Sequence, residues 1–359
     1  MPDKKLAAIL TSKAPEESFK GGVERFNLYL ENYLCRNGYT VDYYFPDRSD
    51  EYVFNKIGAL NKFFVQCSAG RKLRNKGKYE LIISNGGYGA GLRKVRGTRF
   101  LSVHHGTSAG LQDSIKSKIT PKRFLLDKYL IYGLPEFLSG IKSRRVAVGN
   151  SVRYELKKYY HADSFLLCNA VDTDHFRRQL KEEENDSKAL TCIFISRFDY
   201  WIKGFDILLK MINRLKNIRW ILIISGEHNL VPCGNVEVYE NISYKDLPRF
   251  YNKADIAIYL SRYEGNSYYL LEALSSSLPV IATSAGEAKY IYRNNILNDL
   301  LIKSSIESDN VIAEIESMVE MLRDKNKRES IGRISRKIIE EKYSLTQWER
   351  ELSLILEKI

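Results

Sequence analysis

The sequence predicts an α/β protein with two doubly wound domains. At 359 residues the chain is long enough for two domains, and its 44% hydrophobic and 28% charged content is that of a globular protein. Short apolar runs alternate along the chain with longer stretches of helical periodicity. This alternation is typical of parallel sheets that are covered by helices.

The first half begins with a strand and a glycine pair. Leu6–Leu10 reads as a buried strand, and helical periodicity begins at Phe26, just after Gly21 and Gly22. A strand, a glycine pair and a helix form a geometry that lets phosphate approach backbone N–H groups. The run lacks the lysine and Ser/Thr of a P-loop and the spacing of a dinucleotide-binding motif.

Three further segments complete this half. Residues 39–45 form an expected strand, and residues 50–78 form an expected basic helical segment. The strand 79–84 leads into the glycine-rich run 85–91, which lacks dinucleotide-binding spacing and is expected to be a flexible loop. The strand that starts at Phe100 ends on His104 and His105. Histidines at that end lie where open α/β sheets bind ligands.

The second half carries two cations after its first strand. Residues 191–196 form this expected strand, and Arg197 follows it directly. Lys203 then precedes Gly204 and an amphipathic helix over 205–215. Arginine can bind a diphosphate bidentately, while lysine acts as a mobile point charge. Two such cations at the carboxyl end of a strand can neutralise a diphosphate.

A short helix between two strands forms the second candidate motif. The strands are 255–260 and 279–283, and the helix contains Tyr268, Leu271 and Glu272 in helical rhythm. Asn266 or Ser267 is expected to cap the helix through its side-chain oxygen. Gly265 beside the cap lets a ligand approach the partly positive helix N-terminus. We therefore expect an anion there, with phosphate favoured.

Two carboxylates, Glu264 and Glu272, flank this motif. A hydrolase acid/base pair needs carboxyl groups roughly 5–9.5 Å apart. A continuous helix would separate these two by about 12 Å, although a loop position for Glu264 loosens this limit. Separate contacts with the two ends of one ligand are favoured. The alternative is that Glu264 merely ends a strand and Glu272 is solvated.

The chain resembles the retaining nucleotide-sugar glycosyltransferases of glycosyltransferase family 4, which have the two-domain GT-B fold. The resemblance spans nearly the whole chain and is strong from Ser196 to Glu287. The similarity lies in Glu264 and Glu272 with Ala273, in Pro279–Ala282 with Gly286, and in Arg197 with Lys203 and Gly204. The family commonly has a second glycine after Gly286, where this chain has Glu287.

The resemblance implies a role for each candidate residue. Glu272 would hold the donor ribose, and Glu264 would contact the donor sugar. The N–H groups of Gly265, Asn266 and Ser267 would face sugar and phosphate. Arg197 and Lys203 would bind the diphosphate, and Gly21 and Gly22 would face it from the other domain. His104 would lie against the donor sugar. Glu264, His104, Arg197 and Lys203 are the candidate catalytic residues.

The resemblance also implies the architecture. The two Rossmann-like domains would face each other across a cleft, with acceptor binding in residues 1–165 and donor binding in residues 166–342. A last helix over 343–359 would pack back on the first domain. The sequence motif Asp172-Thr-Asp174 could suggest a metal site, but in the resembling segment it is structural. We expect no cofactor and no metal.

The expected reaction is metal-independent, retaining transfer of a hexosyl unit. The donor is a nucleotide diphosphate sugar, with UDP-sugar favoured and GDP-sugar next, and the acceptor is a hydroxyl of a glycan or lipid-linked molecule. The alternatives are a nucleotide-sugar epimerase or phosphorylase on the same fold, or a non-catalytic binding partner. The composition favours polysaccharide assembly in a bacterial cell envelope.

The charge distribution and the cysteine content indicate the kind of partner and the cellular compartment. Residues 1–170 hold 29 Lys and Arg against 15 Asp and Glu, whereas residues 171–359 are nearly balanced. The basic half suggests an anionic partner, and peripheral membrane contact through residues 50–130 is one candidate. No nucleic-acid motif is present. Five scattered cysteines and the lack of a signal peptide or long apolar run predict a cytoplasmic protein, with peripheral contact at the inner membrane face as an option.

Overall fold

The computed structural model describes residues 5–13, 21–47, 60–74, 78–93, 97–179, 189–293 and 295–359. These residues form two compact units. Unit 1 contains β1, Gly21–Cys168 and Glu349–Ile359, and unit 2 contains Asn169–Trp348. The boundary expected from the sequence, between residues 165 and 166, lies close to this change of unit.

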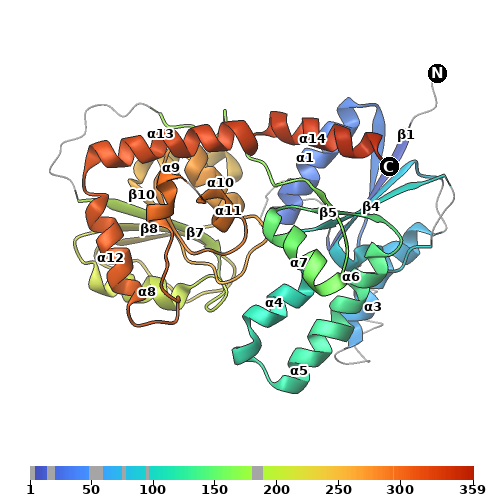
Figure 1. Cartoon of the computed structure of the whole chain (residues 1–359), viewed down its shortest axis with the longest axis horizontal. Helices are drawn as coiled ribbons and strands as arrows, with labels where there is room; N and C mark the ends of the chain where they lie inside the picture. The colour runs from blue at the N-terminus through green and yellow to red at the C-terminus, as the bar shows by residue number, and fades with distance from the viewer. Residues whose placement is uncertain are drawn as a thin grey trace. The chain divides into compact units, whose positions relative to one another are not determined.

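Unit 1 is built on a six-stranded parallel sheet in the order β2-β1-β3-β4-β5-β6. Ile9 of β1 lies opposite Tyr43 of β2 and Ile83 of β3. The chain therefore adds β2 on one side of β1 and then β3 on the other. Figure 1 shows β1, β4 and β5 of this sheet. The strands are β1 (Lys5–Leu10), β2 (Tyr39–Tyr44), β3 (Leu81–Asn85), β4 (Arg99–His104), β5 (Arg144–Ala147) and β6 (Phe165–Leu166).

The helices of unit 1 follow the strands in alternation. They are α1 (Gly22–Arg36), α3 (Asn61–Leu73), α4 (Ser108–Ser114), α5 (Pro121–Leu125), α6 (Gly133–Gly140) and α7 (Asn150–Tyr160), with short helices η2 (Gly86–Gly89) and η3 (Lys116–Lys118) and a π-helical segment η4 (Leu126–Ile131). The end of α14 (Leu345–Glu357) also belongs to this unit. There Glu349 accepts a hydrogen bond from Arg36 at 2.5 Å.

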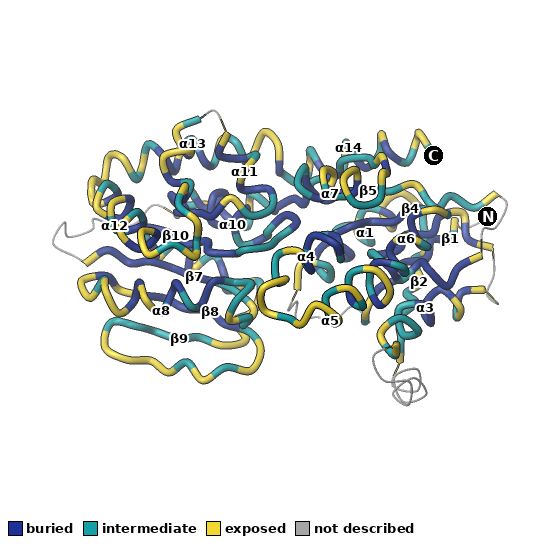
Figure 2. The backbone as a smooth tube through the Cα atoms, turned by 60° about the horizontal axis from the view of Figure 1, so that its bottom comes forward, coloured by how far each residue is buried: buried dark blue, intermediate teal, exposed yellow. Residues whose placement is uncertain are grey.

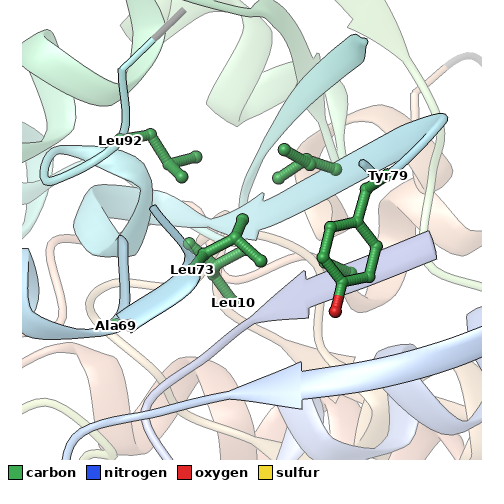
Figure 3. Packing of buried hydrophobic residues seen from close by; sticks show 7 residues of the cluster. Leu10, Ala69, Leu73, Tyr79 and Leu92 are labelled. Carbon is green, nitrogen blue, oxygen red and sulfur yellow. The ribbon is translucent and has the colours of Figure 1, made fainter. Parts of the chain in front are cut away.

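The core under α3 is formed by apolar side chains from three elements and the segments between them. Figure 3 shows Leu10 of β1 with Ala69 and Leu73 of α3. Tyr79 and Leu92 close the cluster from either side of β3. Burying these side chains stabilises the sheet by about 25 cal/mol per Å² of apolar surface removed from water.

The glycine-rich run 85–91 is not the flexible loop that its composition suggested. It forms η2 and packs against α3, with Gly87, Gly89 and Gly91 buried. A Cβ at Gly91 would lie 2.0 Å from the Cys67 carbonyl oxygen of α3. The glycines therefore permit close backbone packing rather than motion. Of the basic segment expected over residues 50–78, residues 50–59 and 75–77 lie outside the described ranges.

Unit 2 is built on a five-stranded parallel sheet in the order β11-β10-β7-β8-β9. Figure 1 shows α8 on one side of this sheet and α9, α10 and α13 on the other. The strands are β7 (Thr191–Arg197), β8 (Arg219–Ser225), β9 (Val236–Glu240), β10 (Ile256–Tyr259) and β11 (Val280–Ala282). In Figure 2 the strands at the centre of this sheet are buried, and the edge strand β9 is partly exposed.

The helices of unit 2 include the 18-residue α13 near the C-terminus. The helices are α8 (Phe205–Arg214), α9 (Leu247–Lys253), α10 (Tyr268–Ser275), α11 (Ala288–Ile291), α12 (Val311–Met321) and α13 (Lys325–Lys342), with short helices η5 (Tyr244–Asp246) and η6 (Ile296–Leu300). Both units are thus α/β structures with parallel sheets, as the sequence predicts.

Candidate active site

The candidate site of unit 2 lies where its strand order reverses. The chain runs outward from β7 to β8 and β9 and then returns to place β10 on the other side of β7. The loops that leave the carboxyl ends of β7 and β10 diverge at such a point, and open α/β sheets bind ligands there. Lys203 follows β7, and Glu264 follows β10.

The loop after β7 is shaped by an aspartate and a glycine. Asp199 accepts hydrogen bonds from the N–H of Ile202 at 2.8 Å and from that of Lys203 at 3.1 Å. Gly204 has a φ of +73°, and a Cβ there would lie 2.4 Å from the carbonyl oxygen of Leu260. The glycine allows this loop to approach the end of β10 closely.

An arginine clamp joins the two loops. Arg262 binds both carboxylate oxygens of Asp206, at 2.8 and 2.7 Å. Its guanidinium also donates to the Trp201 carbonyl at 2.7 Å and lies 3.6 Å from the centre of the Trp201 ring. A partly buried bidentate pair with ring stacking fixes the geometry of both loops. Sequence reasoning missed this clamp, for which the only signal is an arginine two residues before Glu264.

Lys203 and Glu264 form an ion pair between the loops. The Lys203 Nζ is bonded to Oε1 of Glu264, and the two side chains are 18% and 20% exposed. Ser261 also donates to this carboxylate oxygen, at 3.5 Å. The structure thus brings together two residues that the sequence predicted for one site. A partly exposed ammonium at this edge can exchange its carboxylate partner for an incoming phosphate.

Arg197 is the last residue of β7 and is exposed. No described residue forms a hydrogen bond or ion pair with its guanidinium. The backbone on either side is fixed, because Arg197 is paired with Ser225 in the sheet and Phe198 N–H donates to Ser225 at 2.7 Å. An arginine whose backbone is held in place and whose guanidinium has no partner among the described residues is suited to bind an anionic ligand.

Glu272 is buried in α10, with 2% exposure. Tyr251 of α9 donates a hydrogen bond to its Oε2 at 2.7 Å. The alternative that Glu272 is a solvated surface residue is therefore wrong. A buried carboxyl group needs hydrogen-bond partners, and the tyrosine supplies one. Whether Glu272 contacts a ribose stays a prediction.

The loop over Gly265–Ser267 is fixed by its neighbours rather than by a side-chain cap. Ser267 occupies the N-cap position of α10, but its side chain forms no capping hydrogen bond, so this part of the expectation is wrong. Asn169 instead donates to the Asn266 carbonyl at 2.7 Å. A Cβ at Gly286 would lie 2.7 Å from the Gly265 carbonyl oxygen. The loop is thus held from two sides by segments distant in sequence.

Glu287 replaces the expected second glycine and is fully buried. Tyr343, just after α13, donates to its carboxylate at 3.1 Å. The side chain therefore points into unit 2, which leaves the turn at Gly286 intact.

In unit 1, His104 lies in a buried polar cluster at the end of β4. It is 1% exposed, its Nε2 lies 3.3 Å from the Ser102 hydroxyl, and its Nδ1 lies 3.9 Å from Glu136. Glu136 also accepts hydrogen bonds from the Ser108 N–H at 2.9 Å and the Tyr160 hydroxyl at 2.5 Å. Contact between His104 and a donor sugar stays a prediction.

Gly21 and Gly22 lie at the N-terminus of α1, where Gly21 is the N-cap residue. A Cβ at Gly21 would lie 2.3 Å from a carboxylate oxygen of Glu24, which is paired with Lys13 at 2.9 Å. This helix end therefore already faces a carboxylate. Sequence reasoning missed Glu24, and the predicted phosphate contact of the glycine pair stays a prediction.

Two classes of feature are absent from the described part of the chain. It contains no group of three His, Cys, Asp or Glu side chains that could hold a metal ion. Asp172 is used in a turn, where it accepts hydrogen bonds from the N–H groups of Asp174 and His175, both at 3.0 Å. Within the same residues, no helix has the length and apolar character needed to cross a membrane.

Part of the sequence matches a known protein family. Residues 175–338 match the family model of glycosyl transferases group 1. The matched residues all lie in unit 2. Of the predicted site residues, Arg197, Lys203, Glu264–Ser267 and Glu272 lie inside the matched range.

One curated relative and several solved structures are similar to the chain. An uncharacterized 41.2 kDa protein in the cps region of Klebsiella pneumoniae is 25% identical over 160 residues, which are 42% of this chain and 44% of that protein. The match thus spans less than half of the relative.

The similar structures span nearly whole chains. Sucrose-phosphate synthase from Thermosynechococcus elongatus has a TM-score of 0.77 at 15% identity, covering 99% of this chain and 98% of that one. WaaG, a glycosyltransferase involved in lipopolysaccharide biosynthesis, has a TM-score of 0.69 at 13% identity, covering 97% and 99%. Anabaena Alr3699/HepE in complex with UDP has a TM-score of 0.66 at 14% identity, covering 99% and 100%. The fold is GT-B, and together with the match to the group 1 family model it supports a GT-B glycosyltransferase.

Proposed function

We propose that the protein transfers a hexosyl unit from a nucleotide diphosphate sugar to a hydroxyl of a glycan or lipid-linked acceptor, with retention of anomeric configuration. The observation that carries this proposal is the Lys203–Glu264 pair at the point where the strand order of unit 2 reverses. The pair presents one cation for a diphosphate and one carboxylate for sugar hydroxyls.

Stabilisation of the leaving group is the main task of this site. When the bond between the anomeric carbon and the donor oxygen breaks, negative charge develops on the nucleoside diphosphate. Arg197 and Lys203 supply positive charge there without a metal ion. Attack from the same face retains configuration, and the departing phosphate accepts the proton of the acceptor hydroxyl. Glu264, released from Lys203 by the phosphate, accepts hydrogen bonds from the donor sugar.

UDP-sugars are the favoured donors and GDP-sugars the next. A UDP complex of a protein with the same fold supports uridine, and the relative in a cps region supports polysaccharide biosynthesis. We place the reaction in the cytoplasm, with peripheral contact at the inner face of the cell membrane.

Binding of UDP is expected to raise the midpoint of thermal unfolding, both in EDTA and in magnesium. A ligand that binds only the native state stabilises it by mass action, by about 2.7 kcal/mol at a hundred times its Kd. The measurement compares UDP, GDP, ADP and CMP. If none of them shifts the midpoint at millimolar concentration, the donor site is refuted and a non-catalytic binding partner becomes the better explanation.

Product analysis separates the remaining alternatives. Transfer requires an acceptor hydroxyl, an epimerase changes the nucleotide sugar without one, and a phosphorylase needs free phosphate. Incubating the chain with UDP-glucose alone, with an acceptor, or with phosphate therefore distinguishes the three reactions.

The membrane contact is supported by a surface patch on α5 and η4. Leu125, Tyr129 and Leu130 are 54%, 64% and 39% exposed, and Figure 2 shows α5 largely uncovered. Lys116, Lys118 and Lys122 in and before α5 are exposed, and Lys116 lies 5.4 Å from the Phe124 ring centre, whereas Lys128 is mostly buried and paired with Asp113 at 2.5 Å. Apolar side chains among cations are suited to an anionic lipid surface.

The double variant Leu125→Glu/Tyr129→Glu is expected to lose binding to vesicles that contain phosphatidylglycerol. Removing two apolar contacts and adding two negative charges opposes insertion at an anionic interface. Vesicle co-sedimentation measures this, with phosphatidylcholine vesicles for comparison. Val231→Glu is the matched control, because Val231 is 73% exposed but belongs to unit 2. Equal binding of the double variant and the control would refute the patch.

A further inference from the structure

A chain of buried polar side chains crosses the point where the strand order of unit 1 reverses. This point lies between β1 and β3. Asn27 donates to the Thr11 hydroxyl at 3.2 Å, and Asn85 donates to Oδ1 of Asn27 at 2.9 Å. Oδ1 of Asn85 lies 2.7 Å from Nε2 of His105. Thr11, Asn27 and Asn85 are each less than 5% exposed.

The hydrogen bonds among these side chains determine which group donates and which accepts at each contact. The amide nitrogen of Asn85 also donates to the Leu10 carbonyl at 3.3 Å. A backbone carbonyl can only accept, so it fixes the orientation of the Asn85 amide. Oδ1 of Asn85 must then face His105. Because this oxygen is also only an acceptor, Nε2 of His105 must carry the proton.

The remaining ring nitrogen of His105 is consequently a hydrogen-bond acceptor. Partial removal of the ring from water, with a smaller effect of neighbouring His104, lowers the pKa of His105, so the imidazole is neutral near pH 7. A neutral imidazole with a proton on Nε2 has a lone pair on Nδ1. No described residue bonds to this nitrogen, and His105 is partly exposed. The Phe26 ring, 5.0 Å away at 85°, packs against the imidazole and limits its rotation.

We propose that Asn85 is a positioning residue that holds the Nε2–H tautomer of His105, so that Nδ1 accepts a hydrogen bond from a hydroxyl of the sugar-bearing ligand. Ligands bind in open α/β sheets at this kind of strand reversal. Sugar hydroxyls donate hydrogen bonds readily, and an acceptor of fixed orientation selects them. The sugar part of this inference rests on the proposed function, whereas the tautomer does not.

The tautomer can be measured on the wild-type chain, and a variant serves only to assign the signal. Long-range proton–nitrogen NMR correlations distinguish the two ring nitrogens, and the chain has five histidines, so His105→Gln assigns the signal. We expect a protonated Nε2 and an unprotonated Nδ1 at pH 7. A proton on Nδ1, or averaging between the two forms, would overturn the inference.

Kinetics test whether Asn85 acts through His105. Asn85→Ala and His105→Ala are each expected to lower kcat/KM for sugar transfer about tenfold, which corresponds to one hydrogen bond of roughly 1.4 kcal/mol. The double variant should lose no more than His105→Ala alone, because Asn85 then has nothing to position. Losses that multiply would show a merely structural role for Asn85.

The nucleotide shift separates this inference from the proposed function. Unchanged stabilisation of Asn85→Ala by UDP, together with the tenfold kinetic loss, supports both. A wild-type chain that neither binds UDP nor transfers sugar refutes the proposed function and the sugar contact, while the NMR result still decides the tautomer.

Discussion

Replacing Lys203 with alanine is expected to lower kcat by about 10²–10³-fold, the range seen when one stabilising group for developing charge is removed. The Lys203 ammonium lies between the two divergent loops and is paired with Glu264. Without it, Glu264 would face the diphosphate as an uncompensated negative charge. Both side chains are mostly buried, at 18% and 20% exposure, so removing the ammonium is also expected to lower the stability. Steady-state transfer rates and thermal unfolding of the variant measure the two effects.

Two controls make this result specific. Lys210→Ala removes an exposed lysine from α8 and is expected to leave kcat unchanged. Lys203→Arg keeps the charge and should recover part of the rate. If Lys203 acted only by holding Glu264, the double variant with Glu264→Gln would be no slower than Glu264→Gln alone. Wild-type turnover of Lys203→Ala would reject the phosphate role altogether.

The local sequence pattern was sufficient to predict most strands of both sheets and the position of the candidate site in unit 2. The expected strands at 191–196 and 255–260 are observed as Thr191–Arg197 and Ile256–Tyr259. These runs are apolar because parallel strands are buried on both faces, so the signal is continuous and strong. Cations and carboxylates directly after such strands share one edge of the sheet. For this reason sequence order places Lys203 and Glu264 at one edge of the sheet, whereas their ion pair is seen only in the structure.

Contacts between distant segments were not predictable. The Arg262 clamp depends on Asp206 and Trp201, which lie in another loop and helix. Burial of His104 and the bond from Asn85 to His105 likewise depend on packing across strands. Periodicity reports which face of an element is buried, but not which polar groups meet inside. Composition also misled at residues 85–91, because glycine serves close packing as well as flexibility.

Replacing Gly286 with alanine is expected to lower transfer by about 10²-fold, the loss that a displacement of about 1 Å at a reacting centre can cause. Gly286 has a φ of +59°, and its added Cβ would lie 2.7 Å from the Gly265 carbonyl oxygen and 2.9 Å from that of Glu264. Both neighbours are backbone atoms and cannot rotate away. The loop that carries Glu264 must therefore move. Transfer rates and stabilisation by UDP should both decrease.

The variant Gly234→Ala separates displacement of the Glu264 loop from the backbone strain of a left-handed alanine. Gly234 lies in the same unit with a φ of +56°, and an added Cβ there would meet no atom within 4 Å. Both variants lose stability from a left-handed alanine, about 1–2 kcal/mol. Only Gly286→Ala also displaces the site loop, so Gly234→Ala should transfer sugar at the wild-type rate. Equal activity of the two folded variants would mean that the position of this loop does not limit the reaction, and the assignment of Glu264 to the site would fail with it.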